Sequence, residues 1–119
     1  GGLASTAGDL ARWGRALFGG TALPVPYLDR LLDAVPVAPE DPDVRYGAGI
    51  SIRTGTPRGT VQGHGGWIPG YVSSLRHYAD HGVTVAFQID SDRSVADAAS
   101  DLVPALEAAL ADLVIPARP

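Results

Sequence analysis

The sequence predicts an α+β fold in which an antiparallel sheet of about four strands is accompanied by two N-terminal helices and a C-terminal helix. Three observations predict it. Apolar residues recur at helical spacing near both ends, the middle alternates between apolar and polar residues, and glycine-rich turns separate these segments. At 119 residues, 45% of them hydrophobic, the chain is long enough for one domain with a single core over residues 1–119.

The first helix is expected to begin after Thr6, whose hydroxyl can cap it, and Asp9 completes a capping box. The Gly19-Gly20 pair then stops it. Its apolar residues share one face, so we expect Trp13 to lie in the core rather than in a ligand site. This face consists of Leu10, Trp13, Leu17 and Phe18.

A second, shorter helix is predicted from Pro26, which suits a first helical position, to Val35, because Pro36 ends it. The following segment, residues 36–43, contains three prolines and three acidic residues. Proline has no N–H to donate to a strand ladder, and we therefore interpret this segment as an exposed acidic loop.

Two hairpins are predicted next. The first joins a strand over Tyr46–Arg53 to one over Thr60–His64, through a turn rich in glycine. The second joins Tyr71–Tyr78 to Val83–Ile89 through a turn at residues 80–82, where Gly82 can adopt a positive φ. Alternation is most regular in the last strand, whose valines, Phe87 and Ile89 are expected to face the core.

The last helix is expected to begin at Ser94, with Asp97 repeating the capping pattern, and to end at Pro116. Its apolar stripe is long and rich in alanine. Pro104 falls inside this stretch and should kink or restart the helix, because it removes a backbone hydrogen bond and clashes with the preceding turn.

Composition excludes several classes of function. The net charge is −4 and the nine basic residues, all arginine, are scattered, so nucleic acid is not an expected partner. The chain has no cysteine for disulfides or thiolate sites, and no apolar run long enough to span a bilayer. It also has no lysine and no asparagine. Because it opens at Gly1 without a methionine, we expect it to be a piece of a longer protein.

The stretch Gly63–Tyr71 is the strongest candidate for a functional site. It holds four glycines, His64 and Trp67. Glycines let a backbone approach another group closely, and an imidazole beside such a backbone is a common combination at a site. Two interpretations are open on residue types alone: a turn-rich connector with a partly buried histidine, or a strand whose edge and imidazole line an active site.

The order of motifs resembles the C-terminal half of the serine β-lactamase-like hydrolases, which include class C β-lactamases, D-Ala-D-Ala carboxypeptidases and related esterases. The residues at 1–11, GGLASTAGDLA, are similar to the family segment that opens a helix. Tyr46-Gly47-Ala48-Gly49 is similar to the Tyr-Gly-x-Gly strand. Gly63-His64-Gly65-Gly66, followed by Pro69-Gly70-Tyr71, resembles the third active-site motif, in which Lys or His precedes a variable residue and Gly.

The resemblance implies a role for each motif residue. His64 would contact the carboxylate side of a substrate, and the backbone N–H of Trp67 would be an oxyanion donor, which makes these two the catalytic candidates. Gly65 and Gly66 would bind substrate by keeping the strand edge clear. The substrate would be a β-lactam, a D-Ala-D-Ala peptide or an ester, with neither metal nor cofactor.

The other two motifs of the family cannot exist in this chain. A Ser-x-x-Lys pair needs lysine, and a Tyr-x-Asn relay needs asparagine. We therefore expect the chain to be inactive alone and to self-associate through the surface that a missing half would cover. The alternative is a non-catalytic α+β module that binds a ligand or dimerises.

Other polar residues are given structural roles. His77 and His81 are four apart, but they span a strand end and a turn, so we expect exposed histidines rather than a metal site. Ser5, Ser73 and Ser74 lack a nucleophile motif. Arg76, on the strand after the motif, is expected to be a cross-strand surface charge, with contact to a substrate carboxylate as the alternative.

Overall fold

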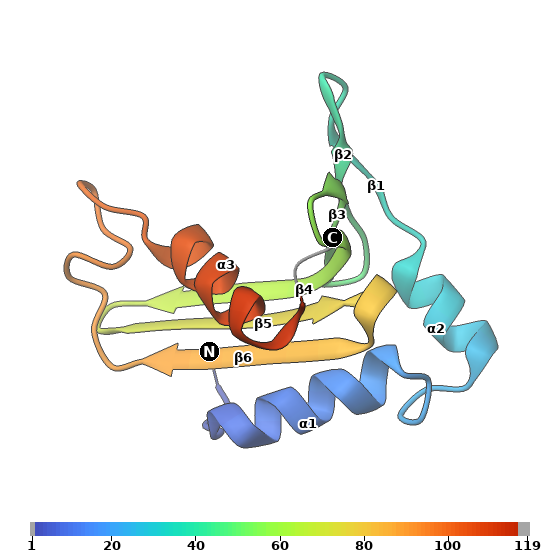
Figure 1. The fold of residues 1–119 in the computed structure, drawn as a ribbon, viewed down its shortest axis with the longest axis horizontal. Coiled ribbons are helices and arrows are strands. Elements are labelled where there is room, and N and C mark those ends of the chain that lie inside the picture. The colour runs from blue at the N-terminus through green and yellow to red at the C-terminus, as the bar shows by residue number, and fades with distance from the viewer. Residues whose placement is uncertain (1, 117–119) are drawn as a thin grey trace.

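The computed structural model describes residues 2–116 and has the α+β class that the sequence predicts. Within these residues, three α-helices accompany one antiparallel sheet of six strands in the order β1-β2-β3-β4-β5-β6. Helix α3 crosses one face of the sheet, and α1 lies along the strands at the β6 side (Figure 1). The bounds are α1 Ala7–Phe18, α2 Val25–Leu32, β1 Val35–Ala38, β2 Asp41–Tyr46, β3 Ser51–Thr56, β4 Gly59–Ile68, β5 Tyr71–Tyr78, β6 Val83–Ile89 and α3 Val103–Val114.

The prediction of about four strands was wrong, because the predicted acidic loop is itself a hairpin of β1 and β2. Its prolines are tolerated for two reasons. Pro36 lies on the outermost strand next to an irregularity in register, and Pro42 lies on β2 before β2 begins to pair with β3 at Val44. At both positions the strand is paired on one side only, so the missing N–H of proline leaves no gap between two neighbouring strands.

The predicted strand Tyr46–Arg53 is broken in the structure. Tyr46 ends β2, a turn follows at residues 47–50, and Ser51 begins β3. Gly49 adopts a φ of 80°, and the N–H of Gly47 donates to the carbonyl of Ile50 at 3.0 Å. The two glycines within the predicted strand, Gly47 and Gly49, therefore lie in a tight connection between two strands.

Helix α1 begins as predicted, and the backbone N–H of Asp9 donates to Thr6 Oγ1 at 3.1 Å. Gly1 of the matching sequence segment lies outside the described residues. Leu17 and Phe18 are buried, but Trp13 is 53% exposed and the prediction that it lies in the core was wrong. Gly14 packs closely against the sheet, since a Cβ there would come within 2.8 Å of Leu75.

The C-terminal helix begins later than predicted. Residues 94–102 form turns, and α3 starts at Val103 with Pro104 in its first turn. Asp97 does accept a hydrogen bond from the backbone N–H of Ser94, at 2.6 Å, but Ser94 has a φ of 59° and no helix follows it. Proline at the start of a helix loses no hydrogen bond, so Pro104 sets the true beginning.

The sheet has two differently covered faces. On the α3 face, Tyr78 packs with Ala111 and Ile115, and the partly buried Val83 and Val85 extend this cluster. On the α1 face, Phe18 stacks on His77 with ring centroids 5.2 Å apart. Two helices thus hold β5 and β6 from opposite sides, which fixes the strands beside β4. Within residues 2–116, no helix is long and apolar enough to cross a membrane.

Candidate functional site

The candidate site lies where β4 continues beyond its neighbour β3. Strand β4 pairs with β5 along its length from Val61 to Ile68. On the other side its pairing with β3 ends at Gly63, opposite Ser51. The segment from His64 to Ile68 therefore has a backbone edge with no strand beside it among the described residues. An edge of this kind offers N–H and C=O groups to an extended ligand.

The hydrogen bonds around Gly63 show which backbone groups face this open edge. Ser51 Oγ donates to the carbonyl of Gly63 at 3.1 Å, so that carbonyl points toward β3. In an antiparallel strand, every second residue directs its N–H and C=O to the same side. The pairing of β4 with β5 is regular from Val61 to Ile68, and the N–H and C=O of Gly65 and Trp67 therefore point to the open edge.

The ring of His64 lies beside the open edge and is held at both nitrogens. Its Nδ1 contacts the carbonyl of Gly65, and its Nε2 lies 3.0 Å from the hydroxyl of Tyr46. A carbonyl only accepts hydrogen bonds, so we assign the proton of the neutral ring to Nδ1. Nε2 then accepts from the Tyr46 hydroxyl. The two rings also meet edge to face, with centroids 5.8 Å apart.

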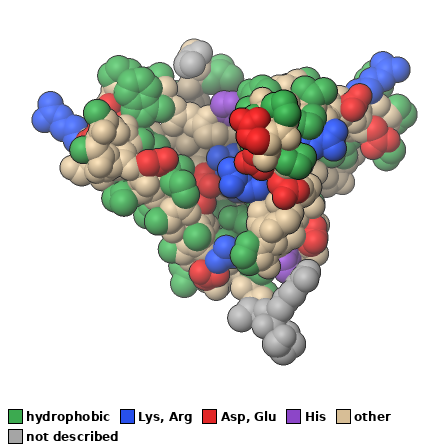
Figure 2. All heavy atoms as spheres, turned by 90° about the horizontal axis from the view of Figure 1, so that it is seen from above, with side chains coloured by type: hydrophobic (Ala, Val, Ile, Leu, Met, Phe, Trp, Pro, Cys, Tyr) green, Lys and Arg blue, Asp and Glu red, His purple; other side chains and the backbone are tan. Residues whose placement is uncertain are grey.

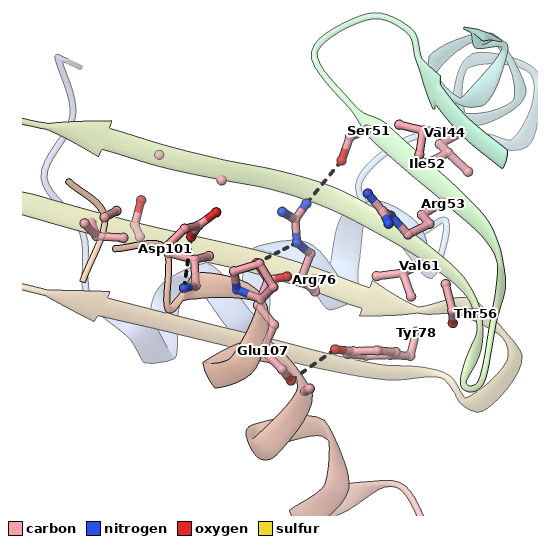
Figure 3. Close-up of a pocket in the computed structure, with 18 of the residues that line it drawn as sticks. Val44, Ser51, Ile52, Arg53, Thr56, Val61, Arg76, Tyr78, Asp101 and Glu107 are labelled. Carbon is pink, nitrogen blue, oxygen red and sulfur yellow. Dashed lines mark hydrogen bonds and ion pairs between the residues drawn. The ribbon is translucent and has the colours of Figure 1, made fainter. Parts of the chain in front are cut away.

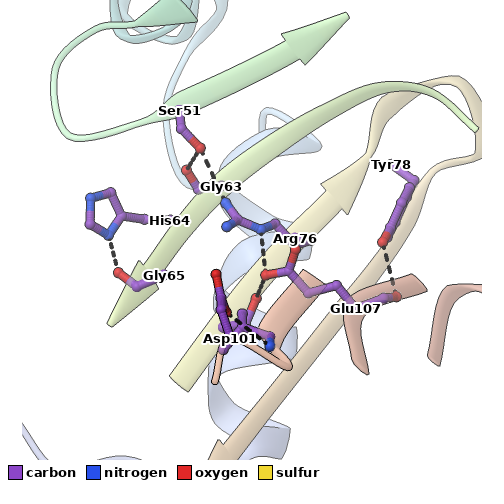
Figure 4. Close-up of polar contacts among 10 residues, drawn as sticks. Ser51, Gly63, His64, Gly65, Arg76, Tyr78, Asp101 and Glu107 are labelled. Atoms are coloured by element: carbon purple, nitrogen blue, oxygen red, sulfur yellow. Dashed lines mark hydrogen bonds and ion pairs between the residues drawn. The ribbon is translucent and has the colours of Figure 1, made fainter. Parts of the chain in front are cut away.

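The four predicted site residues are brought together on β4 but not on one face. His64 pairs across the sheet with Leu75, which contacts the α1 side, and its side chain points away from Arg76 and Glu107 (Figure 4). Trp67 is on the opposite, α3 face and is 57% exposed. The motif therefore surrounds the edge, and a ligand along this edge would meet the imidazole on one side and the indole on the other.

The two glycines after His64 differ in how much space surrounds them. A Cβ on Gly65 would be 3.8 Å from its nearest neighbours, Arg76 Nη2 and the carbonyl of Ser73. A Cβ on Gly66 would come 2.5 Å from Ser73 Oγ. Space inside the sheet thus constrains Gly66, whereas a Cβ on Gly65 would make only ordinary van der Waals contacts.

A cavity of about 650 Å³ lies on the α3 face, between the sheet and α3 (Figure 3). Gly65, Gly66 and Trp67 reach its border, whereas His64 is not among the residues that line it. Inside it, Arg76 Nε lies 2.9 Å from Glu107 Oε1. On the face shown in Figure 2, basic and acidic side chains lie next to one another rather than in separate patches.

The histidines outside the motif are His77 on β5 and His81 in the 3-10 turn Ala79–His81. The prediction of exposed histidines was wrong, because His81 is partly buried and His77 is only 7% exposed. Its Nδ1 lies 2.8 Å from Thr84 Oγ1, and burial lowers its pKa from 6.5. Among residues 2–116, no group of three or more His, Cys, Asp or Glu side chains is placed to hold a metal ion.

Sequence reasoning missed two residues beside the motif. Tyr46 was assigned to a strand, and nothing in the local pattern predicts that its hydroxyl meets a ring 18 positions later. Arg76 was interpreted as a surface charge, yet its side chain is only 20% exposed and bonds Glu107 and Ser51. The register of β3, β4 and β5 would have revealed this second contact, because Ser51, Gly63 and Arg76 form one row across the sheet.

Comparison with known proteins now identifies the family. The family model described as Beta-lactamase matches residues 1–110. Among solved structures, the chain is similar to a D-stereospecific amidohydrolase from Streptomyces sp., with 35% sequence identity and a TM-score of 0.64. That match covers 71% of this chain and 25% of the relative, so the chain spans about a quarter of the relative's length. None of the curated protein sequences matches this chain significantly. The extent of the family match shows that the chain belongs to the beta-lactamase family, whose serine hydrolases its motifs resemble.

Proposed function

We propose that this chain forms one wall of the active site of a serine hydrolase that cleaves an amide through an acyl-serine. The observation that carries the proposal is the open edge of β4 from His64 to Ile68, with the imidazole of His64 beside it. An extended acyl substrate can add to such an edge as a further strand, which places its carbonyl against the backbone. The nucleophile and its base would come from a segment other than this chain, which has no lysine.

Trp67 supplies the oxyanion contact in this proposal. The hydrogen bond from Ser51 shows that the backbone polar groups of Gly63 face the β3 side of β4. Alternate residues of a strand face the same side, so the backbone N–H of Trp67 points to the open edge. A donor fixed in a sheet needs no reorganisation when charge develops on the carbonyl oxygen of the substrate. Gly65 and Gly66 leave the adjacent backbone free of side chains, so a substrate can lie against it.

His64 and Tyr46 act as a pair in this proposal. In the neutral ring, Nε2 is unprotonated and accepts a hydrogen bond from the Tyr46 hydroxyl. A ring that carries a second proton has a donor at Nε2 as well. Nε2–H then donates to the Tyr46 oxygen, and the tyrosine hydroxyl is free to donate to the substrate. Tyr46 thereby satisfies the ring in both charge states.

The Streptomyces relative favours an amide with a D-configured residue as the substrate. It is described as a D-stereospecific amidohydrolase, and the match includes 71% of this chain. We therefore propose D-aminoacyl amides and peptides ahead of β-lactams and simple esters. A non-catalytic binding module is the alternative.

A chimera provides the test. The quarter of the Streptomyces amidohydrolase that matches this chain would be replaced by residues 1–119, and hydrolysis of D- and L-aminoacyl p-nitroanilides would be compared. We expect a D-selective chimera and an acyl-serine detectable by mass spectrometry. His64→Ala should lower kcat/KM about a hundredfold, the order found for removal of one polar group from such a site.

The matched control is His81→Ala, which removes a histidine from the 3-10 turn Ala79–His81, away from the motif. It should leave kcat/KM within about twofold. Equal rates for His64→Ala and His81→Ala would remove His64 from the site. A chimera that folds by circular dichroism but forms no acyl-serine would reject the proposed function and favour a non-catalytic module.

A further inference from the structure

The row of residues across β3, β4 and β5 contains an unusual bridge. Ser51, Gly63 and Arg76 lie directly opposite one another on the three strands. Neighbouring strands are about 4.8 Å apart, so Ser51 and Arg76 are separated by two such spacings. The Arg76 side chain crosses β4 and its Nη1 donates to Ser51 Oγ at 3.1 Å.

Gly63 makes this crossing possible. It lies between the two bridged residues and has no side chain to block the guanidinium. Gly65, the next residue on the same face of β4, is also a glycine, and its Cβ would lie 3.8 Å from Arg76 Nη2. The α3 face of β4 is therefore bare backbone at the two positions that border the arginine head group.

The far end of the bridge is anchored on α3. Glu107 Oε1 accepts from Arg76 Nε at 2.9 Å and from Ser74 Oγ at 2.5 Å. The two partners of the ion pair are 20% and 18% exposed, so solvent screens it less than a surface pair. Tyr78 adds a bond from its hydroxyl to the carbonyl of Glu107.

The near end of the bridge reaches the motif. Ser51 Oγ accepts from Arg76 and gives its own hydrogen to the carbonyl of Gly63, so both capacities of the hydroxyl are used (Figure 4). Gly63 directly precedes His64, and the Ser51–Gly63 pair is where the contact between β3 and β4 ends. A continuous series of hydrogen bonds thus runs from α3 to Gly63, the residue that directly precedes the open edge.

We propose that Arg76 and Ser51 are positioning residues that fix the point where β3 separates from β4, and with it the open edge that carries Gly65 and Trp67. The inference rests on the proposed function, because the edge matters only if substrate binds there. It assigns Arg76 to a contact within the protein rather than to a substrate carboxylate. The guanidinium is engaged at Nε and Nη1, on the face opposite the His64 ring.

Amide hydrogen exchange in the 119-residue chain tests the bridge without any activity assay. Ser51→Ala removes both hydroxyl bonds while changing little volume. We expect the amides at the end of the β3–β4 pairing, residues 51–53 and 61–63, to exchange about tenfold faster. The reason is that the variant loses both the charge-assisted hydrogen bond from Arg76 and the hydrogen bond to the carbonyl of Gly63. Amides shared by β5 and β6 should stay within about twofold. Ser51→Thr, which keeps the hydroxyl, should restore slow exchange.

Arg76→Lys is the second variant, since lysine keeps the charge but cannot bond Glu107 and Ser51 with one planar group. Arg53→Ala is the control, because Arg53 is an exposed arginine on the same strand as Ser51. The bridge is refuted if Ser51→Ala matches Arg53→Ala, or if β5–β6 amides accelerate together with the β3–β4 amides. Either result leaves the proposed function standing, because that depends on the separate test of His64.

Discussion

Replacement of Gly63 by alanine tests the geometry of the motif strand most directly. Gly63 has a φ of 151°, which side chains rarely adopt, and a Cβ there would lie 2.0 Å from the carbonyl oxygen of Leu75. That oxygen belongs to the backbone of β5 and cannot rotate away. The strand must shift instead, and it must do so where β4 is paired on both sides.

The magnitude follows from two separate costs. An unfavourable φ costs about 1–2 kcal/mol. A strand shift that weakens two ladder hydrogen bonds costs about 1 kcal/mol for each bond. Gly63→Ala should therefore lower the free energy of unfolding by about 3 kcal/mol, a large part of the stability of a small domain. With a urea m-value of about 1.5 kcal/mol/M, the unfolding midpoint should fall by about 2 M.

Two control variants separate the costs. Gly70→Ala keeps the positive φ, 87°, but no atom lies within 4 Å of its Cβ, so it should lose only about 1 kcal/mol. Gly65→Ala involves neither a positive φ nor a close contact, so it should leave the free energy of unfolding nearly unchanged. Urea unfolding followed by circular dichroism gives all three midpoints. A Gly63→Ala midpoint within about 0.5 M of Gly65→Ala would refute the close contact between Gly63 and Leu75.

Two further predictions concern pH and association. Burial lowers the pKa of His77, so the unfolded chain binds a proton more readily than the folded one, and stability should fall as pH drops below 6.5. Urea midpoints from about pH 5 to about pH 7.5 should show this slope, and His77→Gln should flatten it; a flat profile for the unaltered chain would contradict it. Strand β6 is a sheet edge without a charged residue, so we expect self-association, which Gln88→Lys should weaken in sedimentation velocity. A monomer at high concentration would contradict this.

The sequence predicted the elements whose signals are local. The capping residues of α1, the alternation of β6 and the glycine at 82 each act within a few positions, and the structure confirms these elements. Gly82 has a φ of 63°, as its turn requires. The α+β class follows from these helices and strands together with α3, whose presence was predicted although its start was not.

The errors arose where tertiary context overrides a local signal. Prolines suggested a loop over residues 36–43, but an edge strand and a strand end have no use for the missing N–H. Asp97 bonds the N–H of Ser94 as a cap would, yet the helix starts only at Val103 because Pro104 favours a first turn. A capping bond is thus not sufficient to start a helix.

The candidate site shows the same division between local and long-range information. The glycines and the imidazole of the motif could be recognised in the sequence, since their spacing is a property of one strand. The partners of that strand could not, because Tyr46 and Arg76 reach it from other strands through register and side-chain length. Tyr46 holds the ring, and Arg76 holds the backbone before it through Ser51. The position of His64 is therefore determined by four strands and a helix, and a variant of any of them can disturb the motif without touching it.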